Sequence, residues 1–469
     1  MPPLKRRIKR LAARLIARPP AQTSDLASAS AGLQRNDAGA LTLHGVDLAA
    51  LGQRERTPLH VVDGERLRQR VRTLTQGTPA WPAGCELATS YKTNPVPGVL
   101  SLMQSAGAGA EVVTEAELWL AQRLGVEPDR LIFNGSVKSD AALRAALSMH
   151  IACININSIG ELDRITRLAE QLGVQAQIGV RAALPGNWSG QFGIAPGSDA
   201  WQRAWTQIIE HPCLQPTGLH VHKGLTLRTA AAVHEHVDQC LETWATLHAD
   251  FDLELGILNL GGSLCVPEVH GISSLQSRLN QTLLAPIAPQ PPGLSAEAYV
   301  EVVHDRLAKS KVAPKPQRVI IETGRGATGD TQHLLLSVVD LKPDPNGYTY
   351  AILDGGTDVA HTLRSESHRI VTAGPARPQR QPYRLVGPVC SPADVLRSAV
   401  WLPSLAVGDV LAVLDTGAYF TSFSLEFTTP APGIRLIDAH QNRWLRRPQQ
   451  FEDMFACDDL PVRPHPPAS

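Results

Sequence analysis

An alternation of short apolar runs with amphipathic segments, from about residue 65 to residue 330, most constrains the fold of this chain. The apolar runs have the length of buried strands, and several intervening segments open with Ser, Thr or Asp and close at Gly, as capped helices do. The expected strands are ELATSYK (86–92), AEVVT (110–114), LIFNG (131–135), CININ (153–157), QIGVRAA (177–183), GLHVHKG (218–224), ILNLGGS (257–263) and VIIETG (319–324). Eight such strand–helix units predict a TIM-type (β/α)8 barrel, with a doubly wound sheet as the alternative.

After residue 330 the alternation ends, and strands separated by Gly- and Pro-rich turns continue to about residue 445. This pattern predicts a second, mostly β domain, which we expect to be a Greek-key-like β barrel. The early run TPLHVVD (57–63) is expected to add a strand to this domain. The predicted division is a basic arm and linker (1–40), strands joining the β domain (41–64), the α/β barrel (65–330), the C-terminal β domain (331–445) and a tail (446–469).

Charge and cysteine content limit which classes of partner and which cellular compartment are expected. Lys+Arg and Asp+Glu both number 44, so the formal net charge is zero and nucleic acid is not an expected partner. Seven scattered cysteines without a CxxC pair argue against a disulfide framework or a zinc site and favour the cytoplasm. No apolar run is long enough to span a membrane. The basic, amphipathic pattern of residues 1–20 is typical of a partly ordered arm or, alternatively, of a membrane-surface or docking helix.

Polar residues stand at the carboxyl ends of several predicted barrel strands, which is where the active sites of such barrels lie. Lys92 closes the first strand, although a lone lysine there also fits a surface position. The later ends carry His220, His222 and Lys223, then Gly261-Gly262-Ser263, then Glu322-Thr323-Gly324-Arg325. A Gly-Gly-Ser turn offers backbone N–H groups to an anion, and an arginine fork suits phosphate. An imine-forming amine, a phosphate cup and an acid together predict pyridoxal 5'-phosphate as the cofactor.

The motifs and their order resemble those of the fold-type III pyridoxal-phosphate decarboxylases, the family of diaminopimelate, ornithine and arginine decarboxylases, over about residues 57–440. SYKTNP resembles the family's lysine motif, which implies that Lys92 is the Schiff-base (aldimine) residue. GAGAEVVTEAEL resembles the GxGxDxxSxxEL block, with Glu111 where that pattern usually has Asp. GLHVHKG resembles the strand whose second histidine, His222 here, stacks on the cofactor ring.

Two further motifs of the resemblance concern the phosphate and the pyridine nitrogen. LNLGGS resembles the glycine phosphate turn, with Ser263 in place of a third Gly, and IETGR resembles the EPGR motif. The resemblance implies that Glu322 pairs with the pyridine nitrogen and that Arg325 contacts the phosphate. The implied cofactor contacts are Lys92, Glu111, His222, Gly261, Gly262, Ser263, Glu322, Gly324, Arg325 and Tyr419.

The predicted β domain carries two more motifs of the family. GPVCSPAD (387–394) resembles the GPxCExxD segment, which implies that Cys390 reaches the cofactor of a partner subunit in a homodimer with shared active sites. GAYFTSFSLEF (417–427) resembles the GAY block and implies that Tyr419 lies near the phosphate and Phe427 on the pocket wall. The implied catalytic residues are Lys92, Cys390, His222 and Glu322, and the implied substrate contacts are Arg181, Cys390, Ser391, Asp394 and Phe427.

The acid at position 322 distinguishes between reactions of this fold. A carboxylate keeps the pyridine nitrogen protonated and so favours loss of CO2, through a quinonoid intermediate, whereas the similar racemases carry an arginine there. The Cys390 thiol can then donate a proton to the carbon that lost CO2. We therefore expect an amino-acid decarboxylase, with a racemase or epimerase as one alternative. A non-catalytic, cofactor-binding homologue is the other, although such proteins often lose the lysine or the cysteine that this chain keeps.

The sequence departs from the family on the substrate side. Diamine-forming members carry an acid directly after the cysteine, and this chain has Ser391. The segment 354–370 is shorter than its counterpart and lacks the Arg-Pro-x-x-Tyr pattern that grips a distal carboxylate. We therefore expect an L- or D-amino acid or a conjugated or carrier-tethered derivative, as in siderophore assembly, rather than free ornithine, lysine or meso-diaminopimelate. Efficient turnover of a free diamino acid would require another acid to take over, with Glu366 and Asp358 as the candidates.

Overall fold

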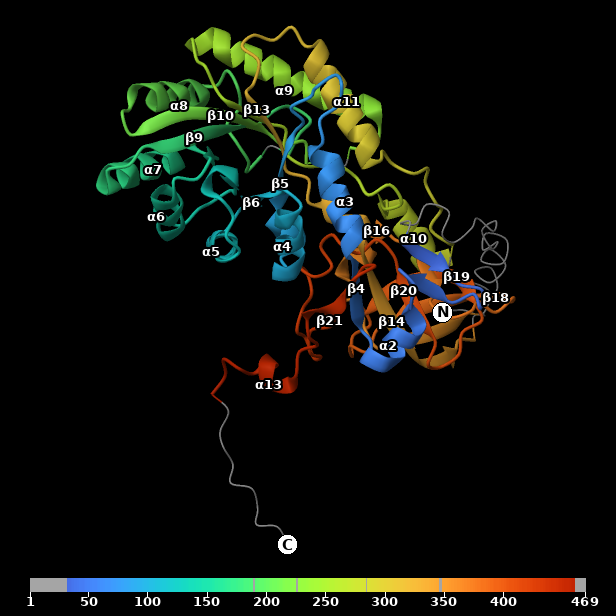
Figure 1. Cartoon of the computed structure of the whole chain (residues 1–469). Helices are drawn as coiled ribbons and strands as arrows, with labels where there is room; N and C mark the ends of the chain where they lie inside the picture. Colours follow the sequence, from blue (N-terminus) through green and yellow to red (C-terminus); the bar gives the residue numbers. More distant parts are fainter. Residues whose placement is uncertain (1–31, 189, 225–226, 284, 346–347, 460–469) are drawn as a thin grey trace.

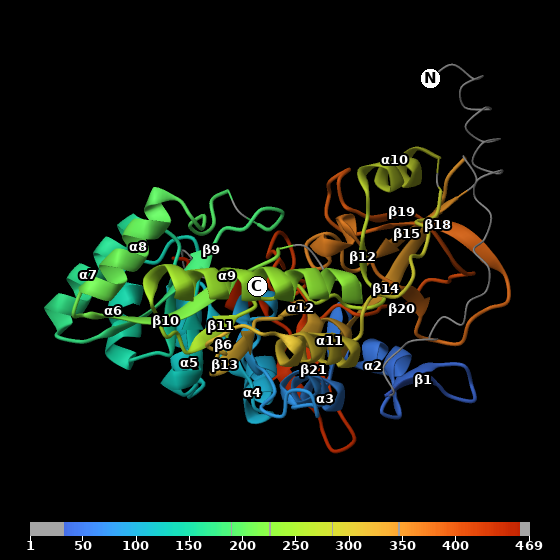
Figure 2. The same ribbon diagram turned by 90° about the horizontal axis from the view of Figure 1, so that it is seen from above.

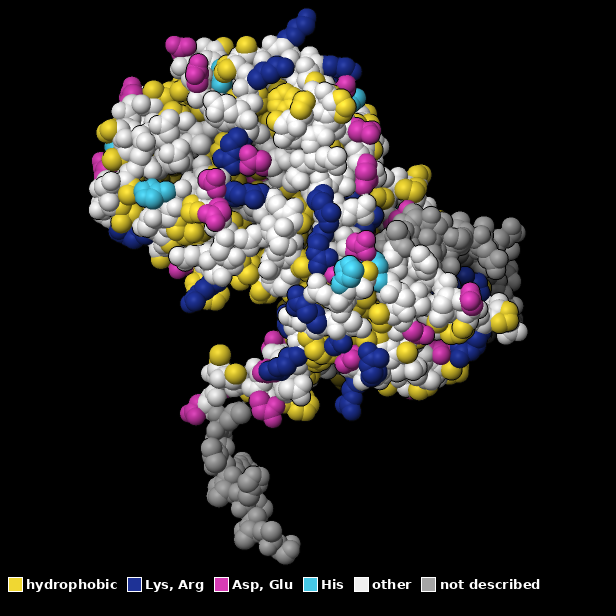
Figure 3. All heavy atoms as spheres, viewed as in Figure 1, with side chains coloured by type: hydrophobic (Ala, Val, Ile, Leu, Met, Phe, Trp, Pro, Cys, Tyr) yellow, Lys and Arg dark blue, Asp and Glu magenta, His cyan; other side chains and the backbone are white. Residues whose placement is uncertain are grey.

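The computed structural model describes residues 32–459 except 189, 225–226, 284 and 346–347. The basic segment 1–20 therefore lies outside the described residues. Figure 1 shows two parts, a barrel surrounded by helices and a β-rich part beside it. Charged side chains of both signs are interspersed over the face drawn in Figure 3. Within the described residues, no helix has the length and apolar character needed to cross a membrane.

Eight parallel strands close into a barrel in the order β10-β11-β13-β5-β6-β7-β8-β9, which confirms the TIM-type fold and excludes the open, doubly wound alternative. The strands are β5 (Glu86–Ser90), β6 (Gly109–Val112), β7 (Leu131–Phe133), β8 (Cys153–Ile156), β9 (Ala176–Ala182), β10 (Leu214–Val221), β11 (Ile257–Asn259) and β13 (Arg318–Ile321). Each of the eight expected runs overlaps one of them, although β6, β9, β10 and β13 begin before their runs do. The runs reach past the strands because their polar ends belong to the loops at the barrel mouth.

All but one of the helices around the barrel begin at a capping residue, and the exception, α4, begins at Pro97. They are α3 (Gly64–Thr75), α4 (Pro97–Ser105), α5 (Glu115–Arg123), α6 (Asp140–Met149), α7 (Ile159–Leu172), α8 (Asp199–Glu210), α9 (Ala230–Phe251) and α11 (Ala296–Lys309). Side chains of Asp63, Thr114, Ser139, Ser158, Ser198, Thr229 and Ser295 accept backbone N–H bonds of the first turn. These bonds satisfy donors that the helix itself leaves free.

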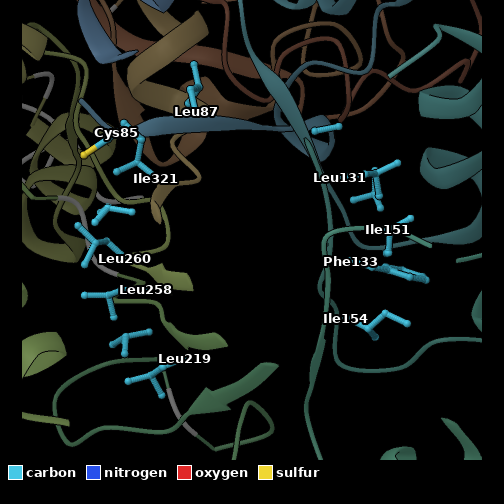
Figure 4. Packing of buried hydrophobic residues seen from close by; sticks show 14 of the residues in the cluster. Cys85, Leu87, Leu131, Phe133, Ile151, Ile154, Leu219, Leu258, Leu260 and Ile321 are labelled. Carbon is cyan, nitrogen blue, oxygen red and sulfur yellow. The ribbon is translucent and has the colours of Figure 1, made fainter. Parts of the chain in front are cut away.

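The barrel strands place alternate side chains in two separate cores. Side chains that point outward pack under the helices, and Figure 4 shows Leu131 and Phe133 on the side of the barrel opposite Leu219 and Leu258. The inward side chains form a small cluster made of Ala88, Ile132, Cys153, Ile257 and Ile320. Because a strand alternates its faces with period two, one apolar run supplies both cores. The apolar plug fills the barrel axis and leaves the carboxyl ends of the strands free for polar groups.

The second domain is a nine-stranded mixed sheet whose path runs from β19 to β22. Because this path has two ends, the domain is a sheet, whereas we expected a Greek-key-like barrel. Its strands are β4 (Leu59–Asp63), β14 (Gln332–Pro343), β15 (Thr349–Leu353), β17 (Ile370–Thr372), β18 (Arg380–Val386), β19 (Val395–Pro403), β20 (Val410–Val413), β21 (Gly433–Ile437) and β22 (Asn442–Arg446). Strand β4 pairs with β14 and β21 in this sheet, although it precedes the barrel in the chain.

Smaller elements complete the molecule. They are β1 (Leu33–Arg35), β2 (Leu41–Leu43), β3 (Val46–Asp47), α2 (Leu48–Glu55), η1 (Tyr91–Thr93), η2 (Pro128–Arg130), β12 (His270–Gly271), α10 (Ser274–Leu283), α12 (Arg325–Thr328), η3 (Gly329–Thr331), η4 (His361–Arg364), β16 (Glu366–Ser367) and α13 (Phe451–Met454).

Loops of the β domain lie against the carboxyl end of the barrel. The backbone N–H of Tyr419 donates to the carbonyl of Thr93 at 2.9 Å, and the Asn94 amide donates to the carbonyl of Gly417 at 3.1 Å. In Figure 2 the two parts lie side by side, with α12 at their junction. The active end of the barrel is therefore bordered by both domains.

Candidate active site

A cavity of about 580 Å³ opens where the barrel strands end and the β domain begins. The barrel contributes Lys92, Glu111, His222, Gly262, Ser263, Glu322 and Arg325 to its wall. The β domain contributes His361, Glu366, Tyr419 and Phe423, and the loop after β9 contributes Trp188. The sequence-predicted cofactor residues thus gather in one place.

Lys92 lies in the single turn η1, two residues beyond the end of β5 rather than on the strand itself. Its Nζ is 3.3 Å and 3.2 Å from the two carboxylate oxygens of Glu111. Burial lowers the pKa of Lys92, but the charges of Glu111 and Glu322 outweigh burial, so the net shift is upward. The exposed fraction of the Lys92 side chain is 44%, and its amine is therefore accessible from the cavity.

Glu322 follows β13 and is one of the two buried acids of the site. Asn134 and Asn259 donate to its Oε1 at 2.8 Å and 2.6 Å, and His220 Nε2 lies 3.2 Å from its Oε2. Burial raises the pKa of Glu322, but the His220 interaction and these hydrogen bonds outweigh it and hold the pKa well below its usual range. The group is therefore a fixed negative charge inside the barrel mouth.

Glu111, at the end of β6, is held by a second set of donors. Ser90 Oγ donates to Oε2 at 2.5 Å, and the Asn134 amide donates to Oε1 at 3.0 Å. Asn134 thus bridges the two buried acids, and Asn155 fixes its orientation by donating to its carbonyl oxygen at 2.8 Å. This network orients both carboxylates before any ligand binds.

His222 stands one residue beyond β10, next to the Gly-Gly-Ser turn. Burial, followed by the nearby charges of His220 and Arg181, lowers the pKa of His222 to about 3, so its ring is neutral at pH 7. The Gly262 N–H donates to His222 Nδ1 at 3.2 Å. The ring is therefore fixed as an uncharged flat surface at the cavity wall.

The Gly-Gly-Ser turn packs so tightly that only small residues fit. Gly261 has φ +66°, and a Cβ there would lie 2.6 Å from the carbonyl oxygen of Val221. Ser263 adopts φ +91°, a left-handed conformation that is strained for a residue with a side chain. Its hydroxyl accepts the Gly224 N–H at 3.2 Å, which helps to hold the strained turn.

Arg325 and Glu366 form an ion pair across the boundary of the two domains. The guanidinium donates to both carboxylate oxygens, at 3.0 Å and 2.7 Å, and lies 5.0 Å from the centre of the Tyr419 ring. His368 Nε2 is 3.3 Å from the same carboxylate. Burial raises the pKa of Glu366, but His368 and Arg325 outweigh it and bring the pKa to about 2. Gly324 lies so close to Thr93 that a side chain there would collide with it.

The predicted substrate residues lie outside this cavity within the chain. Cys390 and Ser391 are exposed, and the Phe427 side chain is 66% exposed. Asp394 is buried, and its carboxylate accepts the N–H groups of Thr357 and Val389 at 2.7 Å and 2.9 Å, so it orders the loop that carries Cys390.

Phe423 lines the cavity, whereas Arg181 and Asp358, which the sequence analysis named for the substrate side, do not. Phe423, four residues before Phe427, lines the cavity and stacks on Tyr419 with 5.6 Å between ring centres. Arg181 packs its guanidinium 4.5 Å from the centre of the Phe192 ring and does not line the cavity. Asp358, the alternative acid for a distal ammonium, is buried and accepts bonds from Gly356 N–H and the Thr429 hydroxyl.

Sequence reasoning missed several residues that shape the site. Asn134 and Asn259 each end or follow a barrel strand, so the rule that found Lys92 and Glu322 would have found them too. Ser90 has the same position on β5. Trp188 and Phe423 lie in irregular segments whose patterns do not predict which ring turns inward.

The donor set fits pyridoxal phosphate. The cavity wall holds an accessible amine, a fixed carboxylate for a protonated ring nitrogen, a neutral imidazole face and a glycine turn whose backbone leaves room for an anion. These are the groups that a pyridine aldehyde with a phosphate requires.

Comparison with known proteins agrees with this geometry. The family model "Pyridoxal-dependent decarboxylase, pyridoxal binding domain" matches residues 66–329. A diaminopimelate decarboxylase of Halalkalibacterium halodurans is 26% identical over 440 residues, covering 90% of this chain and 96% of the relative. One from Vibrio cholerae is 26% identical over 436 residues, covering 90% and 97%.

Solved structures share the fold. A crystal structure of diaminopimelate decarboxylase from M. jannaschii superposes with a TM-score of 0.80 at 22% identity, covering 92% of this chain and 98% of the other. A lysine/ornithine decarboxylase from Vibrio vulnificus, complexed with putrescine, has a TM-score of 0.66 at 20% identity and covers 83% and 96%. The chain belongs to the pyridoxal-dependent decarboxylase family. It is a pyridoxal-phosphate-dependent amino-acid decarboxylase, a carboxy-lyase.

Proposed function

We propose that the substrate is an amino acid whose far end is neutral, such as a diamino acid with its distal amine acylated or otherwise conjugated. One observation carries this proposal: every charged side chain that lines the cavity in the described part of the chain has a partner within the chain. A distal charge on the substrate would have to break one of these pairs. A neutral group would not.

Each acid that lines the cavity in the described residues already has a hydrogen-bond or ion-pair partner. Glu111 holds Lys92, Glu322 lies between two asparagines and His220, and Glu366 binds both arms of Arg325. An ammonium brought into a cavity without a free carboxylate loses its hydration and gains no countercharge. This supports the expectation drawn from Ser391, whose hydroxyl also supplies no charge.

The part of the cavity wall that carries Trp188 and Phe423 suits a larger, neutral group. Trp188 and Phe423 line the cavity while remaining 53% and 52% exposed, and His361 lies beside Phe423 with 6.2 Å between ring centres. Exposed aromatic rings at a cavity mouth favour apolar and amide-containing groups, which stack on them. An acylated or conjugated side chain has this character.

Within this proposal the site residues have distinct roles. Lys92 provides the amine that attaches the cofactor, and Glu322 keeps a proton on the ring nitrogen because its own pKa is low. The cofactor, when bound, supplies the electron sink for the bond to CO2. His222 contributes a neutral face, and the turn at Gly261, Gly262 and Ser263, with Gly324 and Tyr419, borders the phosphate.

The proposed proton donor is Cys390 of a partner subunit. Its thiol is exposed in this chain and does not line the chain's own cavity, and Phe427 is exposed as well. We infer a homodimer in which these residues complete the neighbouring site, a two-fold arrangement that gives two composite sites. Mixing inactive Lys92→Ala and inactive Cys390→Ala proteins should restore part of the activity through mixed dimers. No recovery after verified subunit exchange would contradict shared sites.

A second candidate is meso-diaminopimelate, because the relatives named above are diaminopimelate decarboxylases. This substrate has both an ammonium and a carboxylate at its far end. Among the described residues, the cations that line the cavity are Lys92 and Arg325, and both are paired, so neither is free to hold that carboxylate. Arg364, in the segment where the family carries its carboxylate-binding arginine, lines a different cavity.

The test is CO2 release by the purified holoenzyme from ornithine, lysine and their Nω-acetyl and Nω-succinyl derivatives, each as both enantiomers, and from meso-diaminopimelate. We expect kcat/KM to be about 10-fold or more higher for an acylated compound than for its free parent. Ser391→Glu should move this preference toward the free diamino acids, whereas Ser391→Ala should leave it unchanged. Equal or faster turnover of a free diamino acid by the unmodified enzyme would contradict the proposal and would favour the second candidate when that acid is meso-diaminopimelate.

A further inference from the structure

A second cavity, of about 570 Å³, lies between α10 and the β domain and is lined by Arg364, Arg384 and Arg397. Figure 2 shows α10 beside β18 and β19, the strands that carry the last two. Among the described residues that line this cavity there is no Asp or Glu, and its other polar groups include Ser277, Gln281 and Thr282 of α10. The cavity is thus a concave surface of one charge sign on a molecule whose formal net charge is zero.

Arg397 is the most enclosed of the three arginines, with 6% of its surface exposed. Its guanidinium donates to the carbonyls of Leu363, Leu396 and Glu366, and within the described residues it has no carboxylate at ion-pair distance. Burial lowers the pKa of Arg397 to about 10, with only a partial opposing effect from Glu366. Carbonyl dipoles solvate a buried cation without neutralising it, so the site retains a net positive charge.

Arg384 and Arg364 extend the positive charge toward solvent. The Nε of Arg384 is buried without an acceptor in the part of the chain that the structure describes, and its guanidinium lies 5.9 Å from the centre of the Tyr350 ring. Arg364 is exposed at the edge of the cavity, and no ion pair joins it to any described residue. Because the Arg384 Nε is itself enclosed, an anionic ligand would bind these arginines through their terminal guanidinium nitrogens.

The wall opposite the arginines is fixed in place rather than loosely packed. The Asn280 amide donates to the carbonyls of Ala285 and Ala399 at 2.8 Å and 3.0 Å, and its oxygen accepts the Ser398 N–H at 3.2 Å. This buried side chain ties α10 to β19. The cavity between them is therefore a preformed feature of the fold.

We propose that this cavity binds a small polyanion, a molecule with two or more carboxylate or phosphate groups. Three guanidinium groups without carboxylate partners can hold such a ligand through charge-assisted, partly bidentate hydrogen bonds. A single carboxylate would neutralise only part of the charge, so the site favours multiple anionic groups. The volume accommodates a molecule of the size of citrate or pyrophosphate.

The proposed site is connected to the catalytic cavity through the segment 361–366. Arg397 donates to the carbonyls of Leu363 and Glu366 in this segment, and Arg364 lies between them. Other members of the same segment, His361, Thr362, Ser365 and Glu366, line the catalytic cavity. A bound polyanion that engages Arg397 and Arg364 would restrain this shared segment and change how the catalytic cavity receives its substrate.

Titration calorimetry of the full-chain holoenzyme tests the site independently of any decarboxylase substrate. Citrate and pyrophosphate are the probes, and acetate is the monovalent control. We expect one ligand per chain, with Kd below about 1 mM for at least one probe and no measurable binding of acetate. Whichever probe binds more tightly assigns the ligand to the polycarboxylates or to the phosphates. The use of holoenzyme keeps the proposed phosphate cup filled by the cofactor.

Variants locate the binding. Arg384→Gln and Arg364→Gln should each weaken binding at least about 10-fold, whereas Arg203→Gln, an exposed arginine of α8, should leave it unchanged. Both test residues are only partly buried or exposed, so these variants are expected to fold, and an unchanged melting temperature would verify it. Absence of binding by both polyanions, or equal affinity in Arg384→Gln and the unmodified chain, would overturn the proposal.

Discussion

The buried acids and the exposed aromatic rings of the catalytic cavity differ in how firmly the fold holds them. On the barrel side, Glu111 and Glu322 are buried and fixed by Ser90, Asn134 and Asn259. At the rim, formed by the loop after β9 and by the β domain, Trp188 and Phe423 remain about half exposed, with 53% and 52% of their surfaces accessible. Moving a fixed buried charge carries a large energetic cost, whereas replacing an exposed ring carries a small one. The contrast suggests that the reaction type is set by the barrel and the substrate range by the exposed rim.

The largest loss of activity is expected when Lys92, on the barrel side of the cavity, is replaced. Lys92→Ala should lower kcat by at least about 10³-fold, because the cofactor loses its covalent anchor. Borohydride reduction of the unmodified holoenzyme should fix a pyridoxyl group on Lys92, as peptide mapping by mass spectrometry would detect. Lys309→Ala, at an exposed lysine of α11, should keep full activity. A label on any other lysine would show that the cavity has been assigned to the wrong amine.

Glu322→Gln should give the next largest effect, a loss of about 10²–10³-fold in kcat. The amide preserves the shape of the side chain but removes the fixed charge that keeps the ring nitrogen protonated. Cofactor binding, followed by absorbance, should persist. The matched control is Glu301→Gln, an exposed acid of α11. If kcat of Glu322→Gln stayed within a few-fold of the unmodified enzyme, another group would have to protonate the nitrogen.

Changes at the rim should act on substrate binding. Trp188→Ala should raise KM for the best acylated substrate by about 3- to 10-fold, with kcat changed less than about 2-fold, because the ring contacts the distal group and not the reacting atoms. Trp119→Ala, at a tryptophan that is 57% exposed on α5, provides the control. An equal fall in kcat would show that Trp188 acts in the catalytic step, which would contradict its assignment to substrate binding.

The smallest effect is expected at the Arg325–Glu366 pair, where the two sides meet. The ordinary pKa of Glu366 is 4.5; burial raises it, but His368 and Arg325 outweigh burial and bring it to about 2 in the fold. A carboxyl with a lowered folded pKa stabilises the fold above its ordinary pKa, and this stabilisation is lost as the pH falls from about 4.5 toward about 2.

Glu366→Gln should therefore lower the free energy of unfolding by about 1–3 kcal/mol at pH 7, which corresponds to a few degrees in Tm. The difference from the unmodified protein should shrink between pH 4.5 and pH 2, as thermal unfolding followed by circular dichroism would show. Glu452→Gln, in the exposed helix α13, is the control. A difference in Tm that is independent of pH would show that the carboxylate charge is not the cause.

The sequence predicted the parts of this molecule that depend on local pattern. The barrel strands alternate their faces with period two, and Lys92 and Glu322 follow strand ends, so both were found by rules that need no partner. The Arg325–Glu366 pair was not predictable in the same way, because the two residues belong to different domains and meet only after the fold forms.

Phe423 shows the same limit at a single segment. It lies in the block that begins at Gly417, and sequence reasoning named Phe427 of that block but not Phe423. The backbone at Tyr419 has φ +67°, so the chain turns there and no regular period applies to the residues that follow. In such a segment the side chain that faces the cavity is set by the turn geometry and not by spacing.

The position of β4 has a consequence for synthesis of the protein. This strand is made before the barrel, yet its neighbours β14 and β21 are made after the barrel. At ordinary rates of translation, β4 leaves the ribosome on the order of tens of seconds before β21 does. During that interval its apolar side chains Leu59, Val61 and Val62, all fully buried in the finished sheet, have no partner strand. The nascent chain is therefore the form of this protein most exposed to aggregation, and a chain that ends before Gln332 leaves β4 without either of its neighbours.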